Sequence, residues 1–207
     1  MKHPNIIKII CHDIGRHLGC YGVKSINSNA IDTLAKNGIL FKNSFATSPG
    51  CSPSRAAIAT GMYPHNTGVL GLAHAHFGWS LDKKINHIAK YFSKNGYNSI
   101  LFGLQHVTYH EKTLGFNKIF PERPADEVLK NITKIIDSKI FKKPFYAEVN
   151  FFEPHRPFDY GGVKSDKSKG VYIPKYIPKN IYSRREFAEM QGAVSYTHLT
   201  LPTKRIV

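Results

Sequence analysis

The sequence predicts an α/β protein with a mostly parallel sheet flanked by helices. Two observations predict this class. Short runs rich in β-branched and aromatic residues alternate along the chain with longer segments that carry apolar residues at helical spacing. The chain also has 207 residues and a hydrophobic content of 42%, which is enough to bury a core. Such alternation typically builds a parallel sheet with helices on both faces.

The strand-like and helix-like segments can be taken in chain order. Residues 5–11 are nearly continuous apolar sequence, as expected for a buried parallel strand. Further strands are predicted at 39–46, 98–102 and 145–152. Helices are predicted at 28–37, 85–95 and 125–140, and one more after Cys51.

Polar residues follow several of the predicted strands directly. Asp13, Cys51, His106 and His155 each come just after a strand candidate. In open α/β sheets, ligands gather beyond the carboxyl ends of the strands. We therefore expect these four side chains to converge on one edge of the sheet.

The charge balance and the cysteine count limit the function classes. Lys and Arg number 29 against 14 acidic residues, a net charge of +15, which invites a nucleic-acid-binding interpretation. The lysines are scattered, however, so a basic surface that attracts acidic substrates fits better. Three cysteines are too few for a disulfide framework.

The two ends of the chain lead to predictions about location and domain boundaries. The first apolar run is too short for a membrane span and lacks a signal-peptide cleavage region, so the chain as written is predicted to be cytoplasmic. An incomplete N-terminus would make it secreted or periplasmic. Residues 164–185 have the composition of a loop, and 193–207 resemble a non-native read-through tail. Residues 1–192 are then the N-terminal part of a longer catalytic domain, and this fragment alone is expected to be inactive.

The loop that ends at Cys51 has the composition of a reactive site. Pro and Gly precede the cysteine, and Pro53, Ser54 and Arg55 follow it, as in the first turn of a helix. At a helix N-terminus, backbone N–H groups and the helix dipole lower a thiol pKa and attract anions such as sulfate or phosphate. The ordinary alternative is a buried structural cysteine, which is the commoner role for a lone cysteine.

Three motifs together indicate a family. They are Cys-x-Pro-Ser-Arg at 51–55 with Thr-Gly at 60–61, the Gly-Tyr segment 96–106 that ends in His106, and Glu-Pro-His-Arg at 153–156. The first resembles the signature of the type I sulfatases of the alkaline phosphatase superfamily. The other two are similar to the second sulfatase signature and to the Asp-Pro-His segment of the heparan N-sulfatase branch. The resemblance covers roughly residues 5–160.

The resemblance implies a set of catalytic roles. Cys51 would be oxidised to formylglycine by a maturation enzyme, and Arg55 would steady that group. His106 would take the proton whose removal ejects sulfate, and His155 would contact the sulfate and act as a candidate general acid. The substrate would be a sulfated small molecule or glycan, hydrolysed at a sulfate ester or sulfamate, without nucleic acid or membrane partners.

The resemblance also implies a divalent metal. Asp13 matches one of the family's metal-binding aspartates, and Cys51 after its conversion would be a further ligand. His12 stands where the family usually has a second aspartate. Calcium is the expected metal, but a histidine there leaves Mg²⁺ or Mn²⁺ open. A second departure is Leu104, at the position of the family's sulfate-binding lysine.

Several alternatives remain beside the sulfatase interpretation. A phosphonate or phosphate monoester hydrolase of the same superfamily would share this chemistry, and a non-catalytic protein would keep only the fold. His12, His17, Cys11 and Cys20 could form a zinc site, although their spacing fits no familiar pattern. The segment 73–79, which mixes histidines with aromatic residues, is expected to be a loop near the pocket mouth that could stack on a sugar ring.

Overall fold

The computed structural model describes residues 3–74, 76, 78–137 and 144–200. By its internal contacts the chain divides into two units, each described by itself below. The first comprises residues 1–10, 45–123 and 130–150, and the second comprises 11–44, 124–129 and 151–207. The helices and strands are β1 (Ile6–Cys11), η1 (Gly19–Tyr21), α1 (Asn29–Asn37), α2 (Cys51–Thr60), α3 (Pro64–Thr67), α4 (Ile88–Lys94), β2 (Asn98–Gly103), η2 (Glu111–Leu114), β3 (Lys118–Phe120), α5 (Ala125–Asp137), β4 (Phe145–Phe151), η3 (Tyr160–Gly162) and α6 (Ile181–Thr200).

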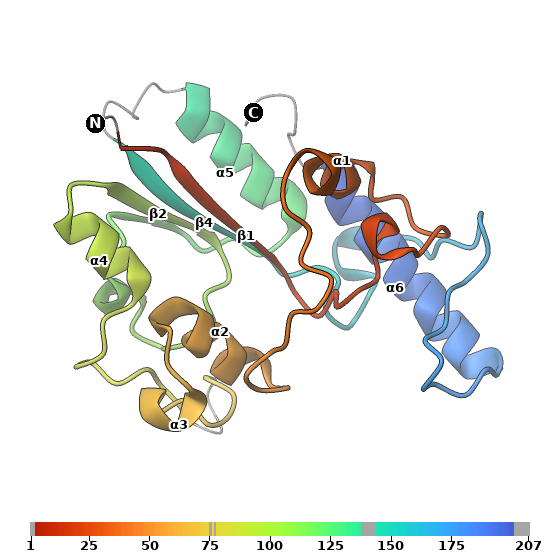
Figure 1. Ribbon diagram of the computed structural model, residues 1–207, viewed down its shortest axis with the longest axis horizontal. Coiled ribbons are helices and arrows are strands. Elements are labelled where there is room, and N and C mark those ends of the chain that lie inside the picture. The colour runs from red at the N-terminus through yellow and green to blue at the C-terminus, as the bar shows by residue number, and fades with distance from the viewer. Residues whose placement is uncertain (1–2, 75, 77, 138–143, 201–207) are drawn as a thin grey trace. The chain divides into compact units, whose positions relative to one another are not determined.

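A four-stranded sheet in the order β1-β4-β2-β3 forms the centre of the first unit (Figure 1). β2 pairs in parallel with β3 on one side and with β4 on the other, in a register that places Leu101 beside Ile119 and Glu148. The two inner strands are almost wholly buried, as expected for apolar runs covered on both faces. The mostly parallel sheet that the sequence predicts is confirmed.

Helices of the first unit cover both faces of this sheet. In Figure 1, α2, α3 and α4 lie on one side and α5 lies on the other. The cluster of apolar side chains next to α2 contains Ala56, Val69, Leu81, Val107 and Leu114, which come from α2 and from the loops around β2. On the other side, α5 buries Ile132 and Ile135, two members of its predicted apolar stripe.

A buried polar network crosses the inner strands of the first unit. The Glu148 carboxylate lies 2.6 Å from the Lys8 ammonium and accepts hydrogen bonds from the Tyr146 hydroxyl (2.7 Å) and the Asn150 amide (3.0 Å). Although burial acts to raise the pKa of Glu148, the nearby Lys8 charge and the hydrogen bonds from Lys8 and Asn150 hold it below its ordinary value. The network therefore keeps a charged carboxylate inside the sheet.

The second unit is built around α6. Its core cluster contains Leu18, Val23 and Ile26, which pack with Met190 and Val194 of α6. The fully buried Gln191 amide donates hydrogen bonds to the carbonyls of Asp166 and Gly170 and accepts them from the Ser25 hydroxyl and the Tyr172 backbone. One side chain thus ties several loops to the helix.

The structure corrects several sequence-based expectations. Residues 39–46 form no strand, and Ile39 and Phe45 are 84% and 90% exposed instead of buried. β1 is an outer strand of the described sheet, with Ile7 and Ile9 exposed on alternate positions. β3 was not predicted, because three residues carry too little periodicity. The loop predicted at 164–185 ends early, since α6 begins at Ile181.

The C-terminal part of the chain bears on two further predictions. The last residues of the helix predicted at 125–140 lie outside the described residues, beyond Asp137. α6 continues to Thr200, and the non-native tail from residue 193 stays a prediction. None of the helices in the described ranges combines the length and the apolar character that a membrane crossing requires.

Candidate functional site

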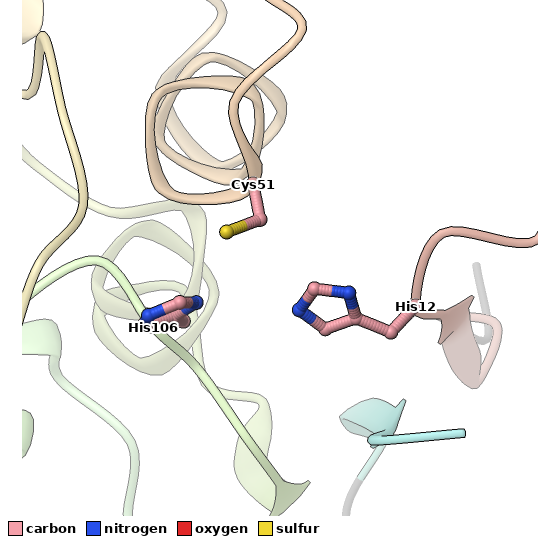
Figure 2. Close-up of side chains that lie close together, drawn as sticks. All are labelled: His12, Cys51 and His106. Carbon is pink, nitrogen blue, oxygen red and sulfur yellow. The ribbon is translucent and has the colours of Figure 1, made fainter. Parts of the chain in front are cut away.

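Cys51 is the first residue of α2 in the first unit (Figure 2). Gly50 precedes it in extended conformation, and the Ser54 N–H donates to the Gly50 carbonyl, which starts the helical hydrogen bonding. Pro53 occupies the first turn, where its missing N–H costs nothing. The helix ends at Gly61, whose left-handed backbone (φ 71°) lets its N–H reach the Ala57 carbonyl. The predicted placement of Cys51 at a helix N-terminus is confirmed.

Arg55 lies one turn further along α2 and is buried, with 6% of its surface exposed. Its Nη1 donates a hydrogen bond of 3.1 Å to the carbonyl of Leu104, just beyond the end of β2. This contact fixes the guanidinium between the helix and the sheet edge. A permanently charged group held so close to the helix N-terminus strengthens the attraction of that end for an anion.

His106 follows β2 and faces the start of α2. A ring nitrogen of His106 lies within 4.8 Å of the Cys51 sulfur, and Figure 2 shows the sulfur directed toward the ring (His12 in that view belongs to the second unit). The loop around it is held by the buried Gln105 amide, which accepts hydrogen bonds from the backbone of Val107 and Thr108. The first unit therefore brings together three predicted residues, Cys51, Arg55 and His106.

A fourth side chain, His74, joins this group. Its ring stacks on that of His106, with centroids 5.7 Å apart and planes inclined by 19°. The preceding residue is fixed, because the Ala73 N–H donates to the Ser52 hydroxyl over 3.0 Å and both residues are buried. Sequence reasoning assigned this segment only to a loop near the pocket. A contact between positions 52 and 73 leaves no local signal in the sequence.

The second unit gathers the other predicted residues. The buried His12 places Nδ1 3.0 Å from one Asp13 oxygen, and His155 places Nε2 3.8 Å from the other. The rings of His12 and His155 meet edge to face with centroids 4.5 Å apart. Nδ1 of His155 is hydrogen-bonded to the Arg156 carbonyl, which can only accept, so this nitrogen carries the proton and Nε2 faces Asp13.

These three side chains could hold a cation. One ligand atom from each of His12, Asp13 and His155 lies within 4.8 Å of the others, a spacing at which one ion could contact all of them. Two nitrogens and one carboxylate suit calcium poorly, because calcium prefers oxygen ligands. The donor set therefore fits a divalent cation but does not favour calcium. His17, from the alternative zinc set, instead stacks on Phe187 in the core of the second unit.

The backbone provides a further observation about two of these residues. Among the described non-glycine residues, Asp13 and His106 are the ones with positive φ, at 53° and 59°. This left-handed conformation is uncommon outside glycine and is concentrated at functional sites. Each residue begins a loop shortly after a strand, β1 for Asp13 and β2 for His106. The left-handed backbone conformation of these two residues was not predicted from the sequence.

A family comparison bears on what these residues are for. The family model described as Sulfatase matches residues 4–198, nearly the whole chain. The chain belongs to the sulfatase family. An "Ulvan-active sulfatase" of Formosa agariphila is 32% identical over 185 residues, covering 86% of this chain and 35% of that protein. The human "N-sulphoglucosamine sulphohydrolase" is 29% identical over 160 residues, covering 73% and 32%.

Solved structures support the same fold for this sulfatase chain. A Bacteroides thetaiotaomicron structure described in connection with the metabolism of multiple glycosaminoglycans aligns with a TM-score of 0.80 at 18% identity, covering 98% of this chain and 57% of that one. The phosphonate monoester hydrolase of Agrobacterium radiobacter aligns with a TM-score of 0.71 at 18% identity, covering 99% and 58%. The sulfatase chain thus spans about a third of these curated relatives and just over half of these solved structures.

Proposed function

We propose that the protein containing this chain hydrolyses sulfate esters or sulfamates, with formylglycine made from Cys51 as its nucleophile. The observation that carries the proposal is the arrangement at the start of α2. Cys51 occupies the first helical position, Arg55 is buried one turn away, and His106 lies within 4.8 Å of the sulfur. Membership of the sulfatase family supports the same chemistry.

Conversion of Cys51 requires a partner. Its Cβ must lose sulfur and be oxidised to an aldehyde, so a formylglycine-generating enzyme or another maturase must supply an oxidant such as dioxygen. One hydroxyl of the hydrated aldehyde would attack the sulfur while the bond from sulfur to the alcohol or amine of the substrate breaks. Deprotonation of the second hydroxyl would then re-form the aldehyde and expel sulfate. The N-terminus of α2 stabilises the negative charge that gathers there.

The chain's own side chains would then divide the remaining work. The Arg55 guanidinium, held by the Leu104 carbonyl, would balance the charge of residue 51 after conversion. His106 would accept the proton from the second hydroxyl, because a nitrogen of its ring lies within 4.8 Å of the Cys51 sulfur. His155 would give a proton to the leaving alcohol or amine. Its Nδ1 is committed to the Arg156 carbonyl, so Nε2 is the nitrogen that would act.

A divalent cation completes the proposal. Asp13 and His12 would hold it, with residue 51 as a further ligand after conversion, and the cation would lower the pKa of the attacking hydroxyl. Calcium is the metal implied by the family resemblance. The nitrogen of His12, 3.0 Å from the Asp13 carboxylate, is a poor ligand for calcium and leaves Mn²⁺ as the alternative to test. Comparing the two ions on the same protein decides between them.

The substrate is proposed to be a sulfated carbohydrate. Curated relatives include the ulvan-active enzyme, the sulphoglucosamine enzyme and an "N-acetylgalactosamine-6-O-sulfatase" of Bacteroides thetaiotaomicron, whose names refer to sugars. The chain's net charge of +15 would attract such acidic polymers. Residues 1–192 are proposed as the N-terminal part of the catalytic domain, and 193–207 as a non-native tail. The protein is proposed to be cytoplasmic, or secreted or periplasmic if a further N-terminal segment exists.

Two other functions keep some support. The fold likeness to the phosphonate monoester hydrolase is compatible with phosphorus substrates. The uncharged Leu104 is compatible with a protein that keeps the fold without turnover. All three functions are compatible with the arrangement at the start of α2. The relative rates of sulfate and phosphate ester hydrolysis distinguish them.

A paired substrate assay on the intact, matured protein tests the proposal. We expect an aryl sulfate to be hydrolysed faster than the matching aryl phosphate, and Cys51→Ala to abolish turnover of both. Cys20→Ala is the matched control, because it removes a thiol from the second unit without touching α2. Faster phosphate hydrolysis would support the monoester hydrolase function. Turnover of neither ester would support the non-catalytic protein.

A further inference from the structure

The loop that carries His74 is fixed against the N-terminus of α2. The Ser52 hydroxyl, one residue beyond Cys51, accepts the Ala73 N–H over 3.0 Å. Ser52 is fully buried and Ala73 is nearly so, which makes this contact costly to lose. This hydrogen bond anchors the residue before His74 next to the helix end.

The His74 ring then lies against a proposed proton acceptor. Its plane is nearly parallel to that of His106, with 5.7 Å between centroids. His106 in turn has a nitrogen within 4.8 Å of the Cys51 sulfur. His74 is half-buried, whereas His76 in the same loop is exposed. The two histidines of this loop thus lie in different environments.

An anion at the start of α2 would gain from further hydrogen-bond donors. A bound sulfate presents three outer oxygens, and each gains from an N–H or a cation. The carbonyl of Leu104 accepts a hydrogen bond from Arg55, but the leucine side chain has no group that could bind an anion. An imidazole offers one N–H when neutral and two when protonated, so a histidine can donate to an anion in either state.

We propose that His74 binds the sulfate group of the substrate, donating a ring N–H to one of its outer oxygens beside His106. This inference rests on the proposed sulfatase function and assigns a residue that contacts the substrate. The stacking on His106 sets the orientation of the ring. The Ser52–Ala73 hydrogen bond sets its distance from the helix end.

A purely structural role for His74 predicts a different outcome from the same variants. If the ring only supported His106 by stacking, phenylalanine would replace it well, because an aromatic ring keeps the face contact. If the ring donates to sulfate, phenylalanine should fail, and asparagine should retain part of the function through its amide N–H. His76→Phe is the matched control, from the same loop at an exposed position.

The experiment measures inorganic sulfate binding by calorimetry, and kcat and KM for an aryl sulfate, on the intact matured protein. We expect His74→Phe to weaken sulfate binding and to lower kcat/KM by about tenfold, the usual loss of one hydrogen bond to a charged group. His74→Asn should recover part of both, and His76→Phe should match wild type.

Other results would overturn the proposal. Wild-type sulfate affinity in His74→Phe would show that the ring acts only by stacking, and equal losses in the His74 and His76 variants would show an effect of the loop as a whole. Calorimetry measures sulfate binding without any turnover. If the protein binds sulfate through His74 but hydrolyses no ester, the proposed sulfatase function is refuted and the role of His74 in binding is not. A wild-type protein that neither binds sulfate nor turns over refutes both.

Discussion

Replacing His87 by asparagine should flatten the pH dependence of stability in mildly acidic solution. His87 is the N-cap of α4 and only 2% exposed, and its Nδ1 accepts the Ala89 N–H over 3.1 Å. Burial lowers the pKa of His87 to about 4, Glu148 acts against this shift, and Lys8 adds to it. The folded protein therefore keeps this ring neutral until the solution is strongly acidic.

The sign and size follow from that pKa. An unfolded histidine takes up its proton near pH 6.5, so between pH 6.5 and about 4 the unfolded chain binds more protons. Stability should fall as the pH falls through this window. A difference of about 2.5 pKa units, at about 1.4 kcal/mol each, corresponds to about 3 kcal/mol at the lower end.

Urea unfolding of the intact protein at several pH values between 4 and 7 measures this effect. In His87→Asn the amide oxygen can still cap α4, but it cannot titrate, so the slope should become shallower; His17, whose pKa burial also lowers, keeps its part of it. The exposed His65 provides the control, and His65→Asn should keep the wild-type slope. The reasoning fails if His87→Asn loses stability on acidification as steeply as the wild type.

Three further predictions concern other parts of the molecule. Glu148→Gln should lower the free energy of unfolding by about 3 kcal/mol, because it leaves the Lys8 charge facing a neutral amide inside the sheet, and no loss in urea unfolding would contradict the network described above. Gly115→Ala should lower the melting temperature by several degrees, because Gly115 has φ 86° and an added Cβ would lie 2.6 Å from Cβ of Lys90; an unchanged melting curve would contradict that geometry. Asp13→Asn should abolish the rise in melting temperature that Mn²⁺ or Ca²⁺ produces, whereas a variant of the exposed Asp159 should keep it; a rise that survives in Asp13→Asn would remove Asp13 from the metal site.

The inner part of the fold was predictable because local pattern and tertiary role agree there. β2 and β4 are apolar runs that the structure buries, and α5 carries its apolar residues at helical spacing. The segment 39–46 looks equally strand-like in composition. Hydropathy cannot tell whether a partner strand exists, and in the described residues this segment has none. The start of α6 escaped prediction because its first turns carry exposed Ile181 and Tyr182 without an apolar stripe.

Some residues of the candidate site could be predicted from the sequence and others could not. Cys51, Arg55 and His106 could be predicted because helix-start chemistry and strand ends are local features of the sequence. Asp13 and His155 also follow predicted strands, and the motif resemblance indicated both of them and His12. The position of His74 could not be predicted, because it depends on contacts between distant loops. The positive φ of Asp13 and His106 could not be predicted either, because Asp and His adopt this conformation more often than most residues but only at a minority of positions.

The measurement that tests the central claim most directly is peptide mass spectrometry across Cys51, after expression with a formylglycine-generating enzyme and with a known sulfatase as the conversion control. The account predicts a peptide whose mass corresponds to an aldehyde at position 51 in place of the thiol. An unmodified cysteine, with the control sulfatase converted in the same cells, would contradict it and leave the proposed reaction without its nucleophile.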